Sequence, residues 1–382
     1  MMLRKILSIL TAVVIVTTMF SASFAKTEDT EITEDKETIM TLDEAIDYAM
    51  AHNPNIVDLK RMERDQEVTY RKAIKAYNVW HEQKGFSFDY PTQYLEYYGY
   101  SKDLAKIVYD NFVAGENTAK STVKYSVMKL AYTIDELEDT INLLEKTIEK
   151  QENDIKVAEV KLKINMGTLL DVESARTTLK STKLQLETVK STYDTLKVSI
   201  KGLLGFDVSK ELKITIPESE FEYLIIEDVN KEIENSLATN STILSAKLEY
   251  KQKEINNVLA KTLQLESTKA VKDAKTAFSD AELRLNNTTN SVKENLLILY
   301  RQIKTNESSV LVAKEELDTL NQKQVQMATM YDLNMLTKND YESFKIAVLN
   351  AENTYKKALH ENILLNERWE IAMLVGDVVS NV

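Results

Sequence analysis

The chain has 382 residues, contains no cysteine and carries a formal net charge of −12. The absence of cysteine excludes disulfides, thiolate catalysis and cysteine-ligated metals. Lysine and glutamate are mixed throughout the chain, and none of the three histidines is spaced against a second histidine or a carboxylate as in a metal site. We therefore predict no metal, no cofactor and no nucleic-acid partner, since nucleic-acid binding needs a clustered basic face.

Glycine and proline are rare, with seven and three residues respectively. Few turns are therefore available, so the elements must be long, and long helices fit this composition better than a sheet-rich globule. We predict an all-α fold of long antiparallel coiled-coil hairpins in two structural repeats, with at most a small β or aromatic segment.

The N-terminus has the features of a secretory signal peptide. Two basic residues precede an apolar run at residues 6–20, and Ser23 and Ala25 are small residues suited to cleavage. An uncleaved anchor is the alternative, although the run is shorter than the about 20 residues of a membrane span. We predict a signal peptide at residues 1–25, an acidic and flexible lead-in at residues 26–40, and an exported protein.

The first predicted repeat covers residues 41–205. Thr41 and Glu44 fit a capping box at the start of a short helix. That helix should end before Pro54, because the residue before a proline disfavours helix. A second helix is predicted at about residues 55–80.

Residues 84–118 form an aromatic insert that differs from the rest of the chain. Tyrosines and phenylalanines cluster there around Gly85, Pro91 and Gly99. This is the one segment whose sequence has strand or aromatic-belt character. A packed cap or an interface loop is the simpler interpretation.

From about Thr122 the apolar residues step by alternating three and four positions, which is the seam of a coiled coil. The seam stops at Asn165, and a returning helix with its own seam ends at Gly205, which suits a helix C-cap. Residues 206–228 form a connector that contains a strand-like stretch at residues 212–217.

The second predicted repeat covers residues 229–378. A helix should run from Thr242 with scarcely a break past residue 289 and continue into a second descending seam that ends at Tyr331. A second loop and a returning helix follow, and this helix ends at Gly376.

The same phrase occurs at the turn of both hairpins. The sequence NMGTLLD at residues 165–171 recurs as NMLTKND at residues 334–340, so Asn, Met, Thr and Asp keep identical offsets. A duplicated loop between two helical halves indicates an internal repeat. The candidate site residues are these loops and their helix caps: Asn165, Met166, Gly167, Thr168 and Asp171 in the first copy, and Asn334, Met335, Leu336, Thr337 and Asp340 in the second.

Capping explains part of this phrase. Threonine followed three residues later by aspartate starts a helix, and asparagine accepts the left-handed conformation that a tight hairpin needs. The two methionines are different, because a side chain at a hairpin tip cannot reach a deep core. They form either a partner surface or a self-packed tip.

Several segments of this chain resemble the corresponding segments of TolC-like outer membrane efflux proteins. They are LDEAI at residues 42–46 with NPNI at residues 53–56, the tip loop leading into LDVESA at residues 170–175, and LLG at residues 203–205, together with the second copy. The resemblance covers nearly all of residues 41–378.

The resemblance implies a homotrimer whose hairpins enclose a tunnel and whose tips bind a periplasmic adaptor (membrane fusion) protein that works with an inner-membrane transporter. Such a protein lies in the cell envelope, in the outer membrane if the source has one and otherwise at the extracytoplasmic surface. Asp340 matches a carboxylate that rings the closed tip in this family. Ser343 stands where a second aspartate is sometimes found, and Asn334 stands where the family usually has glycine.

One departure from the family leads to an alternative function. The family inserts two strands in each half to build a shared barrel, whereas residues 84–118 alternate little and residues 261–293 are lysine-rich and helical in pattern. We therefore interpret the chain as a divergent member with reduced or missing barrel strands. The first hypothesis is an efflux duct component; the alternative is a secreted or envelope scaffold or binding protein derived from this family without a membrane barrel.

An enzyme is not expected. The sequence has no nucleophile elbow, no phosphate-binding loop and no metal cluster, and its few glycines cannot build a phosphate cradle.

Overall fold

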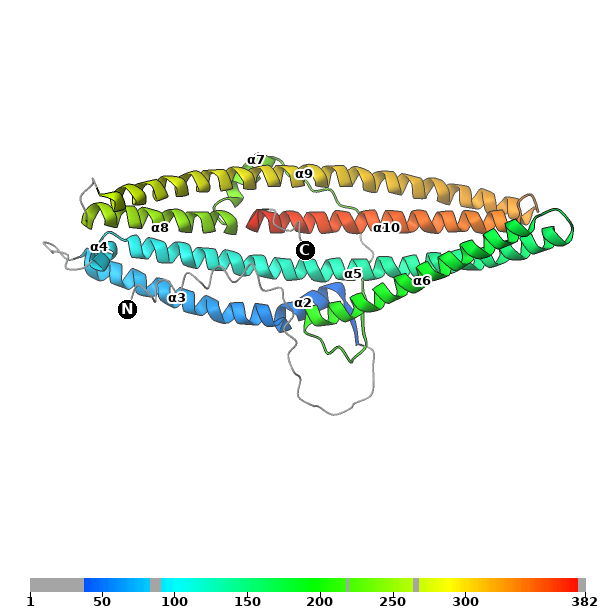
Figure 1. The fold of residues 1–382 in the computed structure, drawn as a ribbon, viewed down its shortest axis with the longest axis horizontal. Helices are drawn as coiled ribbons and strands as arrows, with labels where there is room; N and C mark the ends of the chain where they lie inside the picture. The colour runs from blue at the N-terminus through cyan, green and yellow to red at the C-terminus, as the bar shows by residue number, and fades with distance from the viewer. Residues whose placement is uncertain (1–37, 83–90, 218–219, 264–267, 377–382) are drawn as a thin grey trace. The chain divides into compact units, whose positions relative to one another are not determined.

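The computed structural model describes residues 38–82, 91–217, 220–263 and 268–376, which belong to one compact unit, Glu37–Val382 (Figure 1). Within these residues the chain forms nine helices and one two-stranded sheet. The predicted all-α fold with a small β segment is therefore confirmed. The predicted signal peptide and most of the predicted lead-in lie outside the described residues.

The two halves contain corresponding helices. In the first half these are α2 (Leu42–His52), α3 (Pro54–His81), α5 (Tyr100–Lys163) and α6 (Leu169–Leu204), with the short α4 (Pro91–Tyr97) added between α3 and α5. In the second half they are α7 (Val229–Ser236), α8 (Ser241–Leu263), α9 (Lys269–Asp332) and α10 (Lys338–Val375). The two longest helices, α5 and α9, each have 64 residues.

The equal lengths of α5 and α9 show where the halves differ. From Asn53 to Tyr100 the chain advances 47 positions, whereas from Asn240 to Lys269 it advances 29, which is 18 fewer. Part of this surplus makes α3 longer than α8, with 28 residues against 23. The rest lies between the end of α3 and the start of α5.

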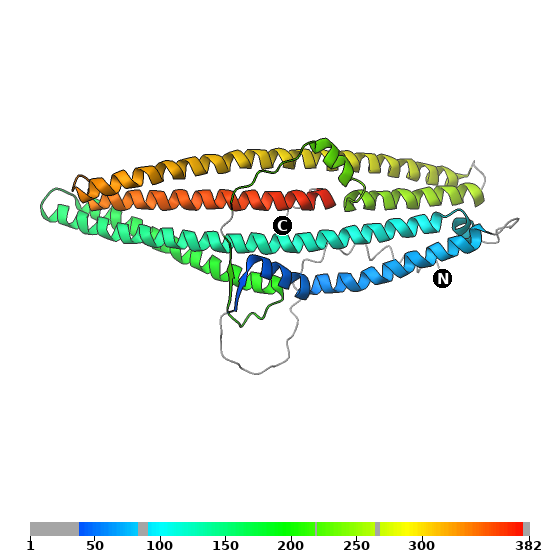
Figure 2. The ribbon, with the colours of Figure 1, turned by 180° about the vertical axis from the view of Figure 1, so that it is seen from behind.

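The helices pack side by side in rows, as their contacts show. Helix α5 packs against α3 and α6 on one side and against α8 and α10 on the other, and α9 packs against both α8 and α10 (Figures 1 and 2). Helices α6 and α3 lie end to end in one row, as do α10 and α8 in another.

A buried asparagine makes the first of these end-to-end junctions. The side-chain oxygen of Asn53 accepts a hydrogen bond from the backbone N–H of Asn55 at 3.0 Å and so caps the start of α3. Its side-chain nitrogen donates to the carbonyl oxygen of Leu203 at 3.0 Å, in the last turn of α6. One side chain therefore satisfies polar groups at both helix ends, which otherwise have no partners within their helices.

Gly205 closes the same junction. Its φ of 72° lies in the left-handed region, and a Cβ atom there would stand 3.1 Å from the carbonyl oxygen of His52. Both conditions favour glycine, so the predicted C-cap of α6 also lies directly against the last residue of α2.

The second junction repeats this arrangement with Asn240, which is fully buried. Its side-chain oxygen accepts from the N–H of Thr242 at 3.2 Å, and its side-chain nitrogen donates to the carbonyl oxygen of Met373 at 3.2 Å. The Thr242 hydroxyl also donates to the carbonyl oxygen of Val375. The negative end of α10 thus faces the positive end of α8, which is the favourable order of helix dipoles.

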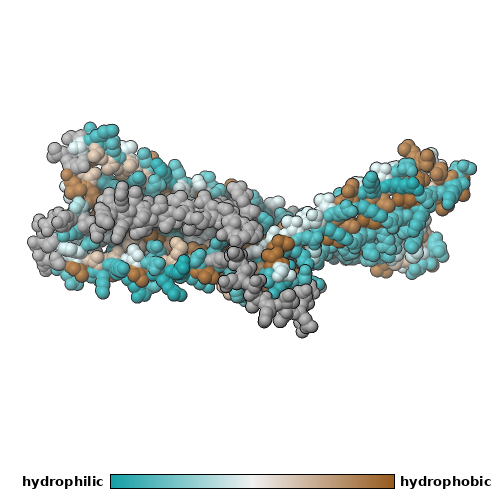
Figure 3. Space-filling view, turned by 60° about the horizontal axis from the view of Figure 1, so that its bottom comes forward, coloured by the Kyte–Doolittle hydropathy of each residue, from teal (hydrophilic) through white to brown (hydrophobic). Residues whose placement is uncertain are grey.

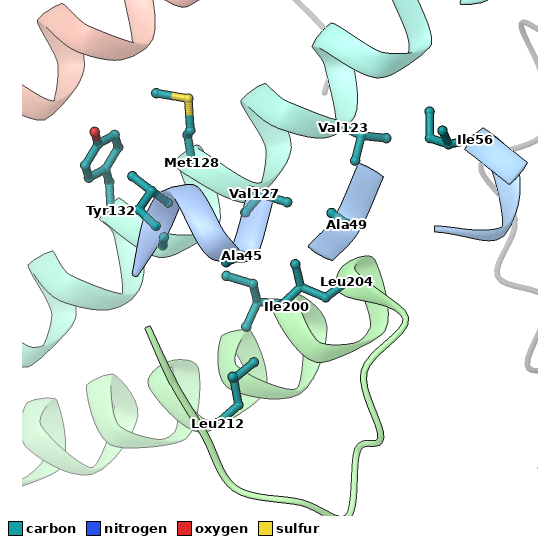
Figure 4. Close-up of a cluster of buried hydrophobic side chains, with 12 residues drawn as sticks. Ala45, Ala49, Ile56, Val123, Val127, Met128, Tyr132, Ile200, Leu204 and Leu212 are labelled. Carbon is teal, nitrogen blue, oxygen red and sulfur yellow. The ribbon is translucent and has the colours of Figure 1, made fainter. Parts of the chain in front are cut away.

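Two hydrophobic cores lie at these junctions. The first joins α2, α3, α5, α6 and the sheet (Figure 4) through Leu42, Ala45, Ala49, Ile56, Val123, Val127, Met128, Ala131, Tyr132, Ile200, Leu204 and Leu212. The second joins α7, α8, α9 and α10 through Ile233, Ile243, Val292, Leu296, Leu299, Ile303, Trp369 and Ala372. Four of these residues, Val292, Leu296, Leu299 and Ile303, belong to the apolar seam predicted for the second descending helix, which is α9.

Polar contacts between α5 and α10 join the two halves. Lys356 Nζ lies 2.6 Å from Asp135 Oδ2 and 2.7 Å from Asp139 Oδ2. Burial alone lowers the pKa of Lys356, but the hydrogen bonds to these two carboxylates outweigh it and raise the pKa above its usual value. The buried His360 ring stacks on Tyr132, with ring centroids 4.3 Å apart.

The predicted continuous helix from Thr242 past residue 289 is wrong. The chain turns back between α8 and α9, which pack against each other along their lengths. Thr268 caps the new helix by accepting a hydrogen bond from the N–H of Val271. Residues 264–267 contain neither glycine nor proline, so the sequence has no strong turn signal at this point.

The strand character assigned to the aromatic insert is also wrong in the described part. Residues 91–97 form α4, and residues 100–118 are the first turns of α5. Gly99, with a φ of 78°, separates the two helices. Residues 84–90 of the predicted insert lie outside the described residues.

The small sheet joins the two ends of the first half. Strand β1 (Thr38–Thr41) pairs in parallel with β2 (Leu212–Thr215), which lies in the stretch predicted to be strand-like. Residues 38–40, which belong to the predicted flexible lead-in, are therefore held by pairing with the connector. The predicted capping box of Thr41 and Glu44 is present at the start of α2.

The junction asparagines should be important for stability. We expect Asn240→Ala to lower the free energy of unfolding by about 1–3 kcal/mol, because it leaves buried backbone groups of α8 and α10 without partners. Urea denaturation of the purified chain measures this. The control is Asn287→Ala on the exposed face of α9, and an equal loss of stability in both variants would contradict the role of the junction.

Candidate functional site: the two hairpin tips

The first tip is a tight turn closed by backbone hydrogen bonds. Asn165 has a φ of 57°, and its N–H donates to the carbonyl oxygen of Leu162 at 3.1 Å. The next N–H, of Met166, donates to the carbonyl oxygen of Lys161 at 2.8 Å. This pair of bonds is the Schellman motif that ends many helices.

The second tip has the same backbone geometry. Asn334 also has a φ of 57°, and its N–H donates to the carbonyl oxygen of Tyr331 at 3.0 Å. The N–H of Met335 donates to the carbonyl oxygen of Met330 at 2.8 Å. Within the described residues these two asparagines are the non-glycine residues with positive φ, so the repeated asparagine has a clear conformational role.

The threonine and aspartate of each phrase start the returning helix. The N–H of Asp171 donates to Thr168 Oγ1 at 3.2 Å, and the N–H of Thr168 donates to Asp171 Oδ2 at 2.8 Å, which completes a capping box. In the second tip the N–H of Asp340 donates to Thr337 Oγ1 at 3.1 Å, and the Thr337 hydroxyl donates to Asp340 Oδ2 at 2.6 Å.

These bonds affect the charge of the first tip. Hydrogen bonds from the backbone N–H and then from the hydroxyl of Thr168 lower the pKa of Asp171 below its usual value. The carboxylate at the start of α6 therefore stays ionised in mildly acidic conditions. Its position also suits the positive end of the helix dipole.

The methionines of both tips are exposed. The exposed fraction is 75% for Met166 and 68% for Met335. Apolar side chains gather at this end of the chain (Figure 3), and the other large exposed apolar residues at the two turns are Ile164, Leu169, Leu170 and Leu333. The two methionines therefore do not pack into their own hairpins.

Leu169 and Leu170 are part of this surface, although they are not among the site residues predicted from the sequence. They follow Thr168 directly and precede the apolar seam of the returning helix. Two leucines outside the seam were therefore the signal in the sequence that could have identified them. The second copy has Lys338 and Asn339 at the same offsets. The two tips thus share a backbone but differ in their apolar content.

Below the first tip, ion pairs join α5 and α6 at heptad intervals. They are Arg176 with Glu159 at 2.9 Å, Lys183 with Glu152 at 2.8 Å, and Lys190 with Glu145 at 2.8 Å. Each pair is half-exposed, so each adds at most about 1 kcal/mol to stability. Their main effect is on the register of the two helices, since a slip separates all three pairs.

The second hairpin is held differently near its tip. The rings of Tyr331 on α9 and Tyr341 on α10 stack with centroids 4.8 Å apart, and Lys345 Nζ lies 4.8 Å from the centroid of the Tyr341 ring. At the corresponding positions the first hairpin has Leu162 and the buried Val172. Among the residues that the structure describes, no ion pair joins α9 to α10.

The predicted constriction at Asp340 stays a prediction. The structure accounts for Asp340 as a helix cap, and the Ser343 hydroxyl donates to the carbonyl oxygen of Asn339 within α10. In the described ranges no three histidine, aspartate or glutamate side chains converge in an arrangement suited to a metal ion. None of the described helices combines the length and apolar character needed to cross a membrane.

Comparison with known proteins identifies the fold. No protein-family model and no curated protein sequence matches the chain. Solved structures do match: the outer membrane protein VceC from Vibrio cholerae has a TM-score of 0.61, with 12% identity over 88% of this chain and 96% of VceC. This chain has the fold of the TolC-like outer membrane channels.

Two further structures support this conclusion. The CmeC outer membrane channel of Campylobacter jejuni has a TM-score of 0.59, with 12% identity over 92% of this chain and 93% of that channel. A membrane protein from Pseudomonas aeruginosa has a TM-score of 0.59, with 11% identity over 93% of this chain and 97% of that protein.

The capping box of the first tip can be tested by titration. We expect the pKa of Asp171 to lie below the ordinary 3.8 and to rise in Thr168→Val, because that variant loses the hydroxyl donor. The stabilisation from this box is complete above pH 3.8 and is lost as the pH falls through the lowered pKa. Carboxyl carbon NMR measures both values, and an unchanged pKa in the variant would contradict this assignment.

Proposed function

We propose that this chain is the subunit of a trimeric duct in the cell envelope, through which compounds pass during efflux. In this proposal the hairpin tips bind an adaptor protein that connects the duct to an inner-membrane transporter. The chain itself performs no catalysis and supplies a passage. The fold that it shares with outer membrane channels supports the proposal.

The apolar tips are the observation that carries this proposal. Met166 and Met335 are exposed on turns whose backbones are held by hydrogen bonds, at the ends of 64-residue helices. Exposed apolar side chains on a rigid support indicate a protein contact surface, since little conformational freedom is lost on binding. A helical hairpin of a partner, with a matching apolar end, fits this surface.

A second candidate is a helical scaffold or binding protein of the envelope. It is favoured by the other end of the chain, where α3, α4 and α5 form one helical turn-back and α8 and α9 form another. The resemblance to efflux proteins places strands there. Such a protein would use the same tips to bind a partner without providing a passage.

The oligomeric state separates the two candidates. We expect the purified mature chain to have the mass of a trimer by native mass spectrometry, both with and without detergent. A trimer is expected because the outer membrane channels whose fold this chain shares assemble as trimers. A stable monomer in both conditions would exclude the duct.

The tips can be tested in cells of the source. We expect a photo-crosslinking residue at Leu169 or Leu170, which are exposed beside the first tip, to capture one envelope protein. The Met166→Asp, Met335→Asp double variant that carries the same crosslinker should lose that capture while its helicity by circular dichroism stays unchanged. The matched control is a crosslinker at Leu184, an exposed apolar residue in the middle of α6. Equal capture from all three positions would contradict tip recognition.

A further inference from the structure

One segment of the connector has the pattern of a β-strand but has no strand partner. In residues 221–226 the side chains of Leu224 and Ile226 pack against the second core. Tyr223 and Ile225 point away from it, and Ile225 is 86% exposed. Side chains that alternate between core and solvent in an extended chain are typical of a strand with one buried face.

The segment is attached to α9 through one residue. The N–H of Leu224 donates to Glu307 Oε1 at 2.9 Å, and Lys304 Nζ donates to the carbonyl oxygen of Leu224 at 2.6 Å. Among the described residues, the other backbone groups of residues 221–227 form no hydrogen bond to a strand or loop. The segment is therefore held in place and still has free backbone donors and acceptors.

The β1–β2 sheet has unpaired strand edges that could accept such a segment. It contains two strands, so each strand has one edge that no strand of the described chain covers. A sheet of two strands is only marginally stable on its own. Its outer face includes Ile39, which is 62% exposed, and the exposed Lys213.

These two features cannot meet within one copy. The sheet packs on α2 and the end of α6, whereas the segment lies on α9, at the opposite edge of the helix rows. A second copy placed head to tail brings the segment of one subunit to the sheet of the next. Such a contact uses two different surfaces, and it closes into a ring when the rotation between copies is right.

The charges of the two surfaces are complementary. The segment and its flanks carry Glu220, Glu222 and Glu227, and the sheet side carries Lys210 and Lys213. None of these five side chains takes part in an ion pair within the described chain, whereas the carboxylate of Glu211, which lies between the two lysines in the sequence, is 3.8 Å from Lys197 Nζ. Opposite charges on facing strands are favourable.

We propose that residues 221–226 of one subunit add as a strand to the β1–β2 sheet of the next subunit, so that the sheets become shared across each subunit boundary. This inference rests on the proposed trimer. It places Tyr223 and Ile225 beside the outer face of the sheet, where Ile39 lies. The partner is a second copy of this chain, bound by strand addition.

The absence of cysteine in the chain gives a clean test. In the mature chain, Ile225→Cys is combined with Ile39→Cys to report pairing at β1, and with Lys213→Cys to report pairing at β2. We expect oxidation with copper phenanthroline to give covalent dimers and trimers from one of these pairs. The matched control combines Ile39→Cys with Leu283→Cys, which is an exposed residue elsewhere on α9 and should remain monomeric on a denaturing gel.

Amide hydrogen exchange of the unmodified chain is an independent measurement. We expect the amides of residues 221–226 to exchange at least about tenfold more slowly in the trimer than in a diluted monomer. A trimer by mass that shows neither crosslinking nor protection would overturn strand addition and leave the proposed duct standing. A chain that stays monomeric at all concentrations would overturn both.

Discussion

The meeting of two helix ends at one buried asparagine is the constraint on which the rest of the structure depends. Asn53 and Asn240 each cap the start of one helix and hydrogen-bond the end of another. The short helices of each half are thereby joined end to end, so that they can run alongside a 64-residue helix. Isolated helices of that length are not stable without packing partners. The junctions therefore supply the partner along the whole length, and the two hydrophobic cores gather around them.

The two halves use this shared plan with different chemistry. In the first hairpin, heptad-spaced ion pairs set the register of α5 against α6. In the second hairpin, stacked tyrosines near the tip and a buried apolar seam hold α9 against α10. The tips differ in the same way, since the first is followed by two leucines and the second by lysine and asparagine. A partner that contacts both tips therefore meets one strongly apolar surface and one mixed surface on the same backbone.

The sequence predicted the parts of this fold that leave a periodic or local signal. The repeated Asn-Met-x-Thr-x-x-Asp phrase gave both hairpin turns, and Thr41 with Glu44 gave the start of α2. The turn between α8 and α9 was missed, because no glycine or proline marks it in the sequence. The parallel pairing of β1 with β2 was also missed, since it joins residues more than 170 positions apart. The double role of Asn53 and Asn240 needed the structure, because a helix cap in the sequence does not show which other helix end lies against it.

The equal lengths of α5 and α9 restrict how this chain can change. Both helices start at one end of the packed rows and end at the tips, so each residue inserted into one of them moves its tip by about 1.5 Å relative to the other. An insertion of seven residues keeps the coiled-coil phase and still staggers the tips by about 10 Å. Length changes along the hairpins are therefore tolerated only when both halves acquire them together. The two halves must keep the same helix length even though their sequences have diverged.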